Sequence, residues 1–148
     1  MTTALDRTPG IEADIAKTFA RFGWDYDRVD DGLFRTGIKG DNGEHDVFIR
    51  VTEHWVTVTI PLFVDRPDEG WGPCALKILA SANHTMNMAK MGLDDVDDVF
   101  LTVELPSEGF AESHLYDALG ALSHYAEKLV MAVIQATRID AMNASANP

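Results

Sequence analysis

Three neighbouring segments of strand character constrain the fold of this chain more than any other feature; they are residues 33–38, 46–51 and 55–64. The first two are joined through Asn42-Gly43, a pair that readily adopts the positive φ angles of a tight hairpin turn. In the third, apolar residues alternate with threonines, which is typical of a sheet with one buried and one wetter face. Because no helix interrupts these segments, the sequence predicts an antiparallel meander.

Three further segments repeat their apolar residues at helical spacing; they are residues 9–22, 73–87 and 112–138. Pro9 and Pro73 suit the first turns of the first two helices, and Gly23 can adopt the left-handed conformation that ends the first. The last and longest helix carries a near-heptad apolar stripe made of Leu115, Leu119, Leu122, Ala126, Leu129 and Val133.

Two more strands, at residues 88–93 and 99–105, flank an acidic turn at residues 94–98. Since a β-α-β crossover is not repeated along the chain, the strands should pair mainly antiparallel. The sequence therefore predicts an α+β fold, in which a mainly antiparallel five-stranded sheet carries helices on one face. The expected order of elements is α-β-β-β-α-β-β-α.

Size and composition favour one domain outside membranes. With 148 residues, of which 46% are hydrophobic, we expect a single domain at residues 9–138 between flexible ends at 1–8 and 139–148. No apolar run approaches the roughly 18–20 residues of a membrane span, and the first residues do not resemble a signal peptide. Cys74 is the only cysteine, so an internal disulfide is impossible and a cytoplasmic location is expected.

The formal net charge of −12 narrows the classes of partner. Such a chain repels the phosphates of DNA, RNA and anionic membranes, whereas it attracts a basic or amphipathic polypeptide. We therefore expect no nucleic-acid and no membrane partner. The alternative interpretation is that the acidity only maintains solubility.

No residue pattern of a catalytic or metal site is found. The five histidines are separated by nine or more residues, and the acidic runs at 25–32 and 94–98 lack the ligand positions of a calcium loop. Cys74 stands at a helix start, where the dipole can lower a thiol pKa, but no second cysteine accompanies it, which favours an inert, packed thiol. We expect no catalytic residue, no metal and no cofactor.

The three tryptophans, Trp24, Trp55 and Trp71, stand at the ends of predicted elements. Large rings at such places usually close the ends of the core, and this is the interpretation that we favour. Trp71 is the expected exception, because its neighbours are loop residues and an exposed tryptophan can anchor a partner peptide.

The helical segment at residues 76–83, the strand end Val103-Glu104-Leu105-Pro106 and the long closing helix together resemble the YbjN family. That family is similar in fold to the class I type III secretion chaperones. The resemblance covers the chain from the first helix to about residue 138. It implies a compact helix-sheet domain that binds polypeptides, often as a dimer, without catalytic residues. It also implies a structural role for Asn83, which is expected to cap or to bridge backbone groups before the next strand.

The combined interpretation is a non-enzymatic binding or regulatory protein with a protein or peptide partner, forming a homodimer. The expected partner-binding residues lie on the third strand and after it; they are Thr57, Val58, Thr59, Phe63 and Trp71. The expected dimer interface is the stripe of the last helix, Leu115, Leu119, Leu122, Leu129 and Val133, although this stripe can equally pack on the chain's own sheet. A domain that senses a small ligand or divalent cation is the alternative, and an enzyme of unfamiliar type is the third possibility.

Overall fold

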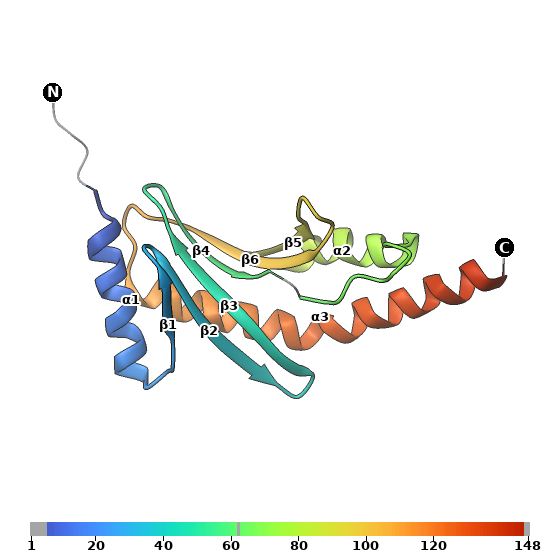
Figure 1. The fold of residues 1–148 in the computed structure, drawn as a ribbon, viewed down its shortest axis with the longest axis horizontal. Helices are drawn as coiled ribbons and strands as arrows, with labels where there is room; N and C mark the ends of the chain where they lie inside the picture. The colour runs from blue at the N-terminus through green and yellow to red at the C-terminus, as the bar shows by residue number, and fades with distance from the viewer. Residues whose placement is uncertain (1–5, 62, 147–148) are drawn as a thin grey trace, which may run out of the picture.

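The structure is a computed structural model and describes residues 6–61 and 63–146. Within them the chain forms three helices and one six-stranded sheet, arranged as shown in Figure 1. The elements are α1 (Thr8–Phe22), β1 (Asp27–Asp30), β2 (Leu33–Gly40), β3 (Gly43–Val51), β4 (Trp55–Ile60), α2 (Pro73–Thr85), β5 (Ala89–Leu93), β6 (Val99–Pro106) and α3 (Glu112–Ala146). All neighbouring strands pair antiparallel, in the order β1-β2-β3-β4-β6-β5, which confirms the predicted fold class.

The sheet has six strands where the sequence predicted five, because β1 was missed. All four residues of β1 are exposed, and its register with β2 shifts between Arg28 and Asp30. A strand that buries no side chain carries no apolar alternation, so the periodicity on which strand prediction depends is absent. Ion pairs hold β1 in place instead: Arg28 contacts Glu12 of α1 at 3.0 Å and Asp27 contacts Arg35 of β2 at 3.1 Å.

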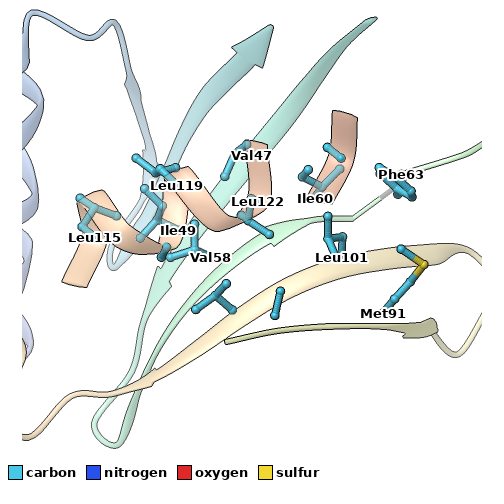
Figure 2. Packing of buried hydrophobic residues seen from close by; sticks show 14 of the residues in the cluster. Val47, Ile49, Val58, Ile60, Phe63, Met91, Leu101, Leu115, Leu119 and Leu122 are labelled. Atoms are coloured by element: carbon cyan, nitrogen blue, oxygen red, sulfur yellow. The ribbon is translucent and has the colours of Figure 1, made fainter. Parts of the chain in front are cut away.

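The core lies on one face of the sheet, between the strands and the three helices. Alternate residues of β3, β4 and β6 are buried on this face, and the register places Ile49, Val58 and Val103 side by side across the three strands. Figure 2 shows Leu115, Leu119 and Leu122 of α3 among these strand side chains. Full burial of each such side chain stabilises the fold by about 1.5–3 kcal/mol.

The helix α3 runs to Ala146, eight residues beyond the predicted end at residue 138. Its added turns contact the start of α2, because α2 lies beside α3 in the opposite direction. The Asp140 carboxylate accepts the Cys74 N–H at the beginning of α2, and the Tyr125 hydroxyl accepts the Asn87 N–H just after its end. This tertiary contact gives residues 139–146 a helical partner that the sequence pattern does not reveal.

Of the ends predicted to be flexible, residues 1–5 and 147–148 lie outside the described residues, while residues 139–146 belong to α3. The strand β4 ends at Ile60 rather than at residue 64, because Pro61 has no N–H to donate to a neighbouring strand. Among the described residues, no helix combines the length and the apolar character needed to cross a bilayer.

Candidate functional site

A groove opens between the end of α1, the strand β2 and the helix α3. Its volume is about 650 Å³, within the range of natural ligand-binding clefts. The residues that line this β2–α3 groove are Gly23, Trp24, Asp25, Thr36, Gly37, Ile38, Lys39, Glu44, Tyr116, Leu119, Gly120 and Ser123. They come from parts of the chain that are far apart in sequence, so only the folded structure assembles the groove.

One end of the groove is lined by Trp24 and Tyr116, and their rings together with the adjoining ring of Phe22 form the aromatic triad. Gly23 ends α1 with a left-handed φ of 65°, and this reversal directs Trp24 back toward α3. The ring of Trp24 stacks on Phe22 at 5.0 Å and on Tyr116 at 6.2 Å. Phe22 is 45% exposed and Tyr116 is 51% exposed, so the triad presents an apolar surface to solvent, which is typical of a contact site.

The side of the groove is an unpaired edge of the sheet. β1 pairs with β2 only as far as Arg35, whereas β2 continues to Gly40, so residues 36–40 have no strand partner on this side among the described residues. Gly40 and Gly43 flank a two-residue turn and form a hydrogen-bonded pair. Along the hairpin, hydrogen-bonded pairs then alternate with non-hydrogen-bonded pairs, and Lys39 and Gly37 belong to the latter kind. The main-chain N–H and C=O groups of Gly37 and Lys39 therefore point away from β3, toward an empty strand position.

The far end of the groove is held by the tip of the β2–β3 hairpin. The Asn42 side-chain amide donates to the Glu127 main-chain oxygen at 3.0 Å, and the Asn42 N–H approaches the Glu127 carboxylate at 3.5 Å. A side chain at Gly40 would displace this carboxylate from its present position. At the near end, Thr36 Oγ1 donates to the Asp25 main-chain oxygen at 2.8 Å. Both ends of the unpaired segment are thus anchored.

The opposite edge of the sheet is closed by Asn83 of α2. Its side-chain nitrogen donates to the Met91 main-chain oxygen at 2.9 Å, and its side-chain oxygen accepts the Met91 N–H at 2.8 Å. One amide thereby takes the place that a further strand would occupy beside β5. The structural role that the resemblance implied for Asn83 is confirmed. On the other side of the sheet β1 is the outermost strand, and residues 36–40 of β2 extend past it and have no strand partner there among the described residues.

A sequence profile of the YbjN family, described as "Putative bacterial sensory transduction regulator", matches residues 13–135. The chain belongs to the YbjN family. The matched residues include most of α1, all six strands, α2 and most of α3, so the groove and both sheet edges lie within the family region. No curated protein matches the sequence closely enough to count as a relative.

The fold of this YbjN chain is similar to that of type III secretion chaperones. The structure titled as the ExsC-ExsE complex superposes with a TM-score of 0.61 and 16% identity, covering 84% of this chain and 94% of that one. A chain of the HopA1-SchA chaperone-effector complex gives 0.60 and 12%, covering 85% and 97%. A chain of the ExoU-SpcU complex from the secretion system of Pseudomonas aeruginosa gives 0.55 and 17%, covering 80% and 96%. At such low identities the likeness concerns the fold alone.

The structure does not gather the five residues expected to bind a partner. Val58 and Phe63 lie in the core with 0% and 3% exposure, which corrects their expected surface position: Val58 faces the helices because it alternates with the threonines. Thr57 and Thr59 lie half-buried on the opposite face of the sheet. Trp71 is half-buried and donates its ring N–H to the Asp97 main-chain oxygen at 2.8 Å. A role for these last three in binding stays a prediction.

The five residues expected at a dimer interface point into the chain's own core. Leu115, Leu122 and Val133 are fully buried, Leu119 is 7% exposed and Leu129 is partly buried. The stripe thus packs on the chain's own sheet, which was the alternative interpretation, and Figure 2 shows this for Leu115, Leu119 and Leu122. A dimer contact on α3 stays a prediction, and it would need other side chains of the helix.

The acidic turn at residues 94–98 and the thiol of Cys74 were considered as possible chemical sites, and both take part in structural hydrogen bonds. In the acidic turn, Asp94 Oδ1 accepts the N–H groups of Val96 and Asp98, each at 2.9 Å, and so forms the turn between β5 and β6. No group of three or more His, Cys, Asp or Glu side chains among residues 6–61 and 63–146 is placed to hold a metal ion. The hydrogen bond to Asp140 raises the pKa of the Cys74 thiol, assisted by burial, which is opposite to the activation that a helix start can provide.

Sequence reasoning missed the groove and its aromatic triad. Trp24 packs against the core as expected, and in addition it lines the groove together with Tyr116, which the sequence analysis did not single out. One signal was present in the sequence: Tyr116 immediately follows the core position Leu115 and therefore cannot share its buried face.

Proposed function

We propose that this YbjN-family chain is a non-enzymatic binding protein whose β2–α3 groove holds an extended segment of a polypeptide partner. The observation that carries the proposal is the unpaired edge of β2 beside the aromatic triad. An added strand obtains its affinity from main-chain hydrogen bonds, and its alternate side chains reach adjoining pockets. The free main-chain groups of Gly37 and Lys39, next to an apolar groove, fit this mode of recognition.

The fold comparison supports the proposal at a coarse level. Solved proteins with this fold occur in complexes with protein partners, such as the HopA1-SchA chaperone-effector complex and the heterodimeric ExoU-SpcU complex. The groove of this chain offers two features that strand addition can use, an unpaired strand segment and exposed apolar rings. The exposed rings are a surface that water solvates poorly and that a partner would cover.

Lys39→Pro tests the proposal directly. Proline removes the outward N–H of residue 39, and no β2–β3 hydrogen bond is lost because that N–H points away from β3. Peptides selected from a random display library against the unaltered protein should bind Lys39→Pro at least tenfold more weakly. The Lys39→Ala control keeps the N–H and should retain binding, and circular dichroism should show the same fold for both variants. Equal binding of the selected peptides to Lys39→Pro would refute strand addition at this edge.

We also propose that the chain self-associates as a homodimer. Several exposed apolar side chains on α2 and α3, among them Leu76, Met131 and Ile139, support this part of the proposal. Sedimentation across the micromolar range measures the state of the chain. A single monomeric species at all these concentrations would remove the dimer and leave the peptide groove untouched.

A further inference from the structure

Two glycines in the interiors of β2 and α3 line the groove, and the fold itself requires neither. Gly120 stands within α3, and a Cβ built there meets no atom within 4 Å. Gly37 stands within β2, and its Cβ would lie 3.7 Å from the His45 main-chain oxygen, an ordinary contact. Neither residue has a positive φ. Glycine in the interior of a helix or strand destabilises the fold relative to alanine, so both positions sacrifice stability without a packing reason.

Gly120 leaves space beside the aromatic triad. It lies four residues after Tyr116, so both residues share one side of α3, and Ser123 continues that side with another small residue. The exposed main chain of α3 at Gly120 and the rings of Tyr116 and Trp24 together form a broad apolar recess. A flat, bulky ring from a partner fits such a recess better than a small or branched side chain does.

Gly37 lies on the other face of the sheet and leaves a carboxylate accessible from the open edge. A Cβ at Gly37 would be 4.0 Å from Glu44 Oε1, so the Glu44 carboxylate extends beside the bare main chain of residue 37. Neither Glu44 nor Asp25 forms an ion pair within the described part of the chain. Of the residues that line the groove, Lys39 is the only basic one. Asp25 and Glu44 outnumber Lys39, which is the cross-strand neighbour of Glu44, so the groove has a small excess of negative charge and favours a positively charged segment.

The geometry of an extended strand relates the recess at Gly120 to the Glu44 carboxylate beside Gly37. Successive side chains of an extended segment point to opposite faces of a sheet. On a segment paired with β2, a ring that enters the recess at Gly120 has neighbours in sequence that point toward the face of Gly37 and Glu44. A lysine or arginine next to the ring can thus pass over Gly37 and reach the Glu44 carboxylate.

We infer that the β2–α3 groove selects a polypeptide segment in which a bulky aromatic residue adjoins a lysine or arginine, with the ring seated at Gly120 and the basic group at Glu44. The inference rests on the proposed function and specifies the chemistry of the partner. It also explains why two glycines that lower stability occur at positions where the fold tolerates a side chain.

The probes are synthetic strand-forming peptides of about seven residues, made of threonine and valine with a variable central pair. Fluorescence anisotropy measures their affinities for the full chain. The pair Trp-Lys should bind about tenfold more tightly than Leu-Lys and several-fold more tightly than Trp-Glu. Equal affinities for all central pairs would overturn the inference.

Variants of the chain separate binding from stability. Gly120→Ala should raise the melting temperature yet weaken binding of the Trp-Lys peptide, and Gly120→Leu should weaken it about tenfold or more. The matched control Gln135→Leu adds a leucine to an exposed position of α3 away from the groove and should leave affinity unchanged. Glu44→Gln should weaken Trp-Lys binding but not Trp-Thr binding. Unchanged affinity in Gly120→Leu would overturn the seat for the ring.

The failure of the inference and the failure of the proposed function are distinguishable. If Lys39→Pro abolishes peptide binding while all central pairs bind alike, strand addition stands and the aromatic-basic selectivity is refuted. If no peptide, selected or synthetic, responds to Lys39→Pro, the proposed function is refuted and the inference falls with it.

Discussion

The Asp140 carboxylate accepts the main-chain N–H of Cys74 through Oδ1 at 2.9 Å, and it accepts that of Ala75 through Oδ2 at the same distance. A side chain near the end of α3 thereby caps the first turn of α2, where main-chain N–H groups lack helical partners and the dipole favours a negative charge. Gly72 allows this approach, since a Cβ there would lie 2.6 Å from Asp140 Cβ. The contact joins two helices that are distant in sequence.

Replacing Asp140 with asparagine should lower the melting temperature by a few degrees, because the amide cannot accept two N–H groups with a full negative charge. Burial raises the pKa of Asp140, but the N–H groups of Ala75 and Cys74 outweigh it and hold that pKa below its usual value. The added stability is thus present above the ordinary aspartate pKa and is lost as the pH falls through the lowered one. Thermal melts between pH 7 and pH 3 should show a smaller acid loss in Asp140→Asn, and identical profiles would contradict the assignment.

Cys74 should react slowly with iodoacetamide at mildly alkaline pH. The hydrogen bond that its thiol donates to Asp140 raises the thiol pKa, and burial adds to the effect, so less of the reactive thiolate is present. Asp140→Asn should accelerate alkylation, measured by mass spectrometry of the intact chain. A rate equal to that of free cysteine in the unaltered protein would contradict this prediction.

His45 should make the fold weaken as the solution becomes mildly acidic. Burial, partly opposed by Glu127, lowers the pKa of His45, whose ring stacks on Phe63 at 5.4 Å. The unfolded chain therefore takes up this proton at higher pH than the folded chain does. Stability is complete above the ordinary histidine pKa of about 6.5 and declines as the pH falls below it. His45→Gln should flatten the melting temperature between pH 7 and pH 5.5, and an unchanged slope would argue against the ring as the titrating group.

Asn83→Ala should destabilise the chain by about 1–2 kcal/mol, because the N–H and C=O of Met91 lose their side-chain partner. The same change opens the β5 edge, which becomes a template for pairing with other strands. Chemical denaturation measures the first effect, and light scattering during prolonged incubation measures the second. Ser81→Ala, on an exposed part of the same helix, is the control and should change neither quantity by a comparable amount.

The strands and helices that bury a face could be predicted from the sequence, because burial imposes a period on neighbouring residues. The alternation of Val56, Val58 and Ile60 and the leucines of α3 are local patterns of this kind. The β2–β3 turn was predicted from a different signal, the pair Asn42-Gly43, and the structure places the two turn residues one position earlier, at 41–42. They lead to an antiparallel sheet covered by helices on one face. The strand β1 has no such pattern, since all of its residues are exposed, and it was therefore overlooked.

The sequence by itself determined the fold class, the helix-covered face of the sheet and the likeness to the YbjN family, since each depends on spacing along the chain. Only the tertiary structure decided that Trp24 meets Tyr116, that Asn83 closes one sheet edge and that β2 extends past β1. The physical reason is that the spacing of apolar residues along the sequence indicates which residues are buried. A groove or an unpaired strand segment depends instead on which distant segments pack together and on where the pairing of two strands stops.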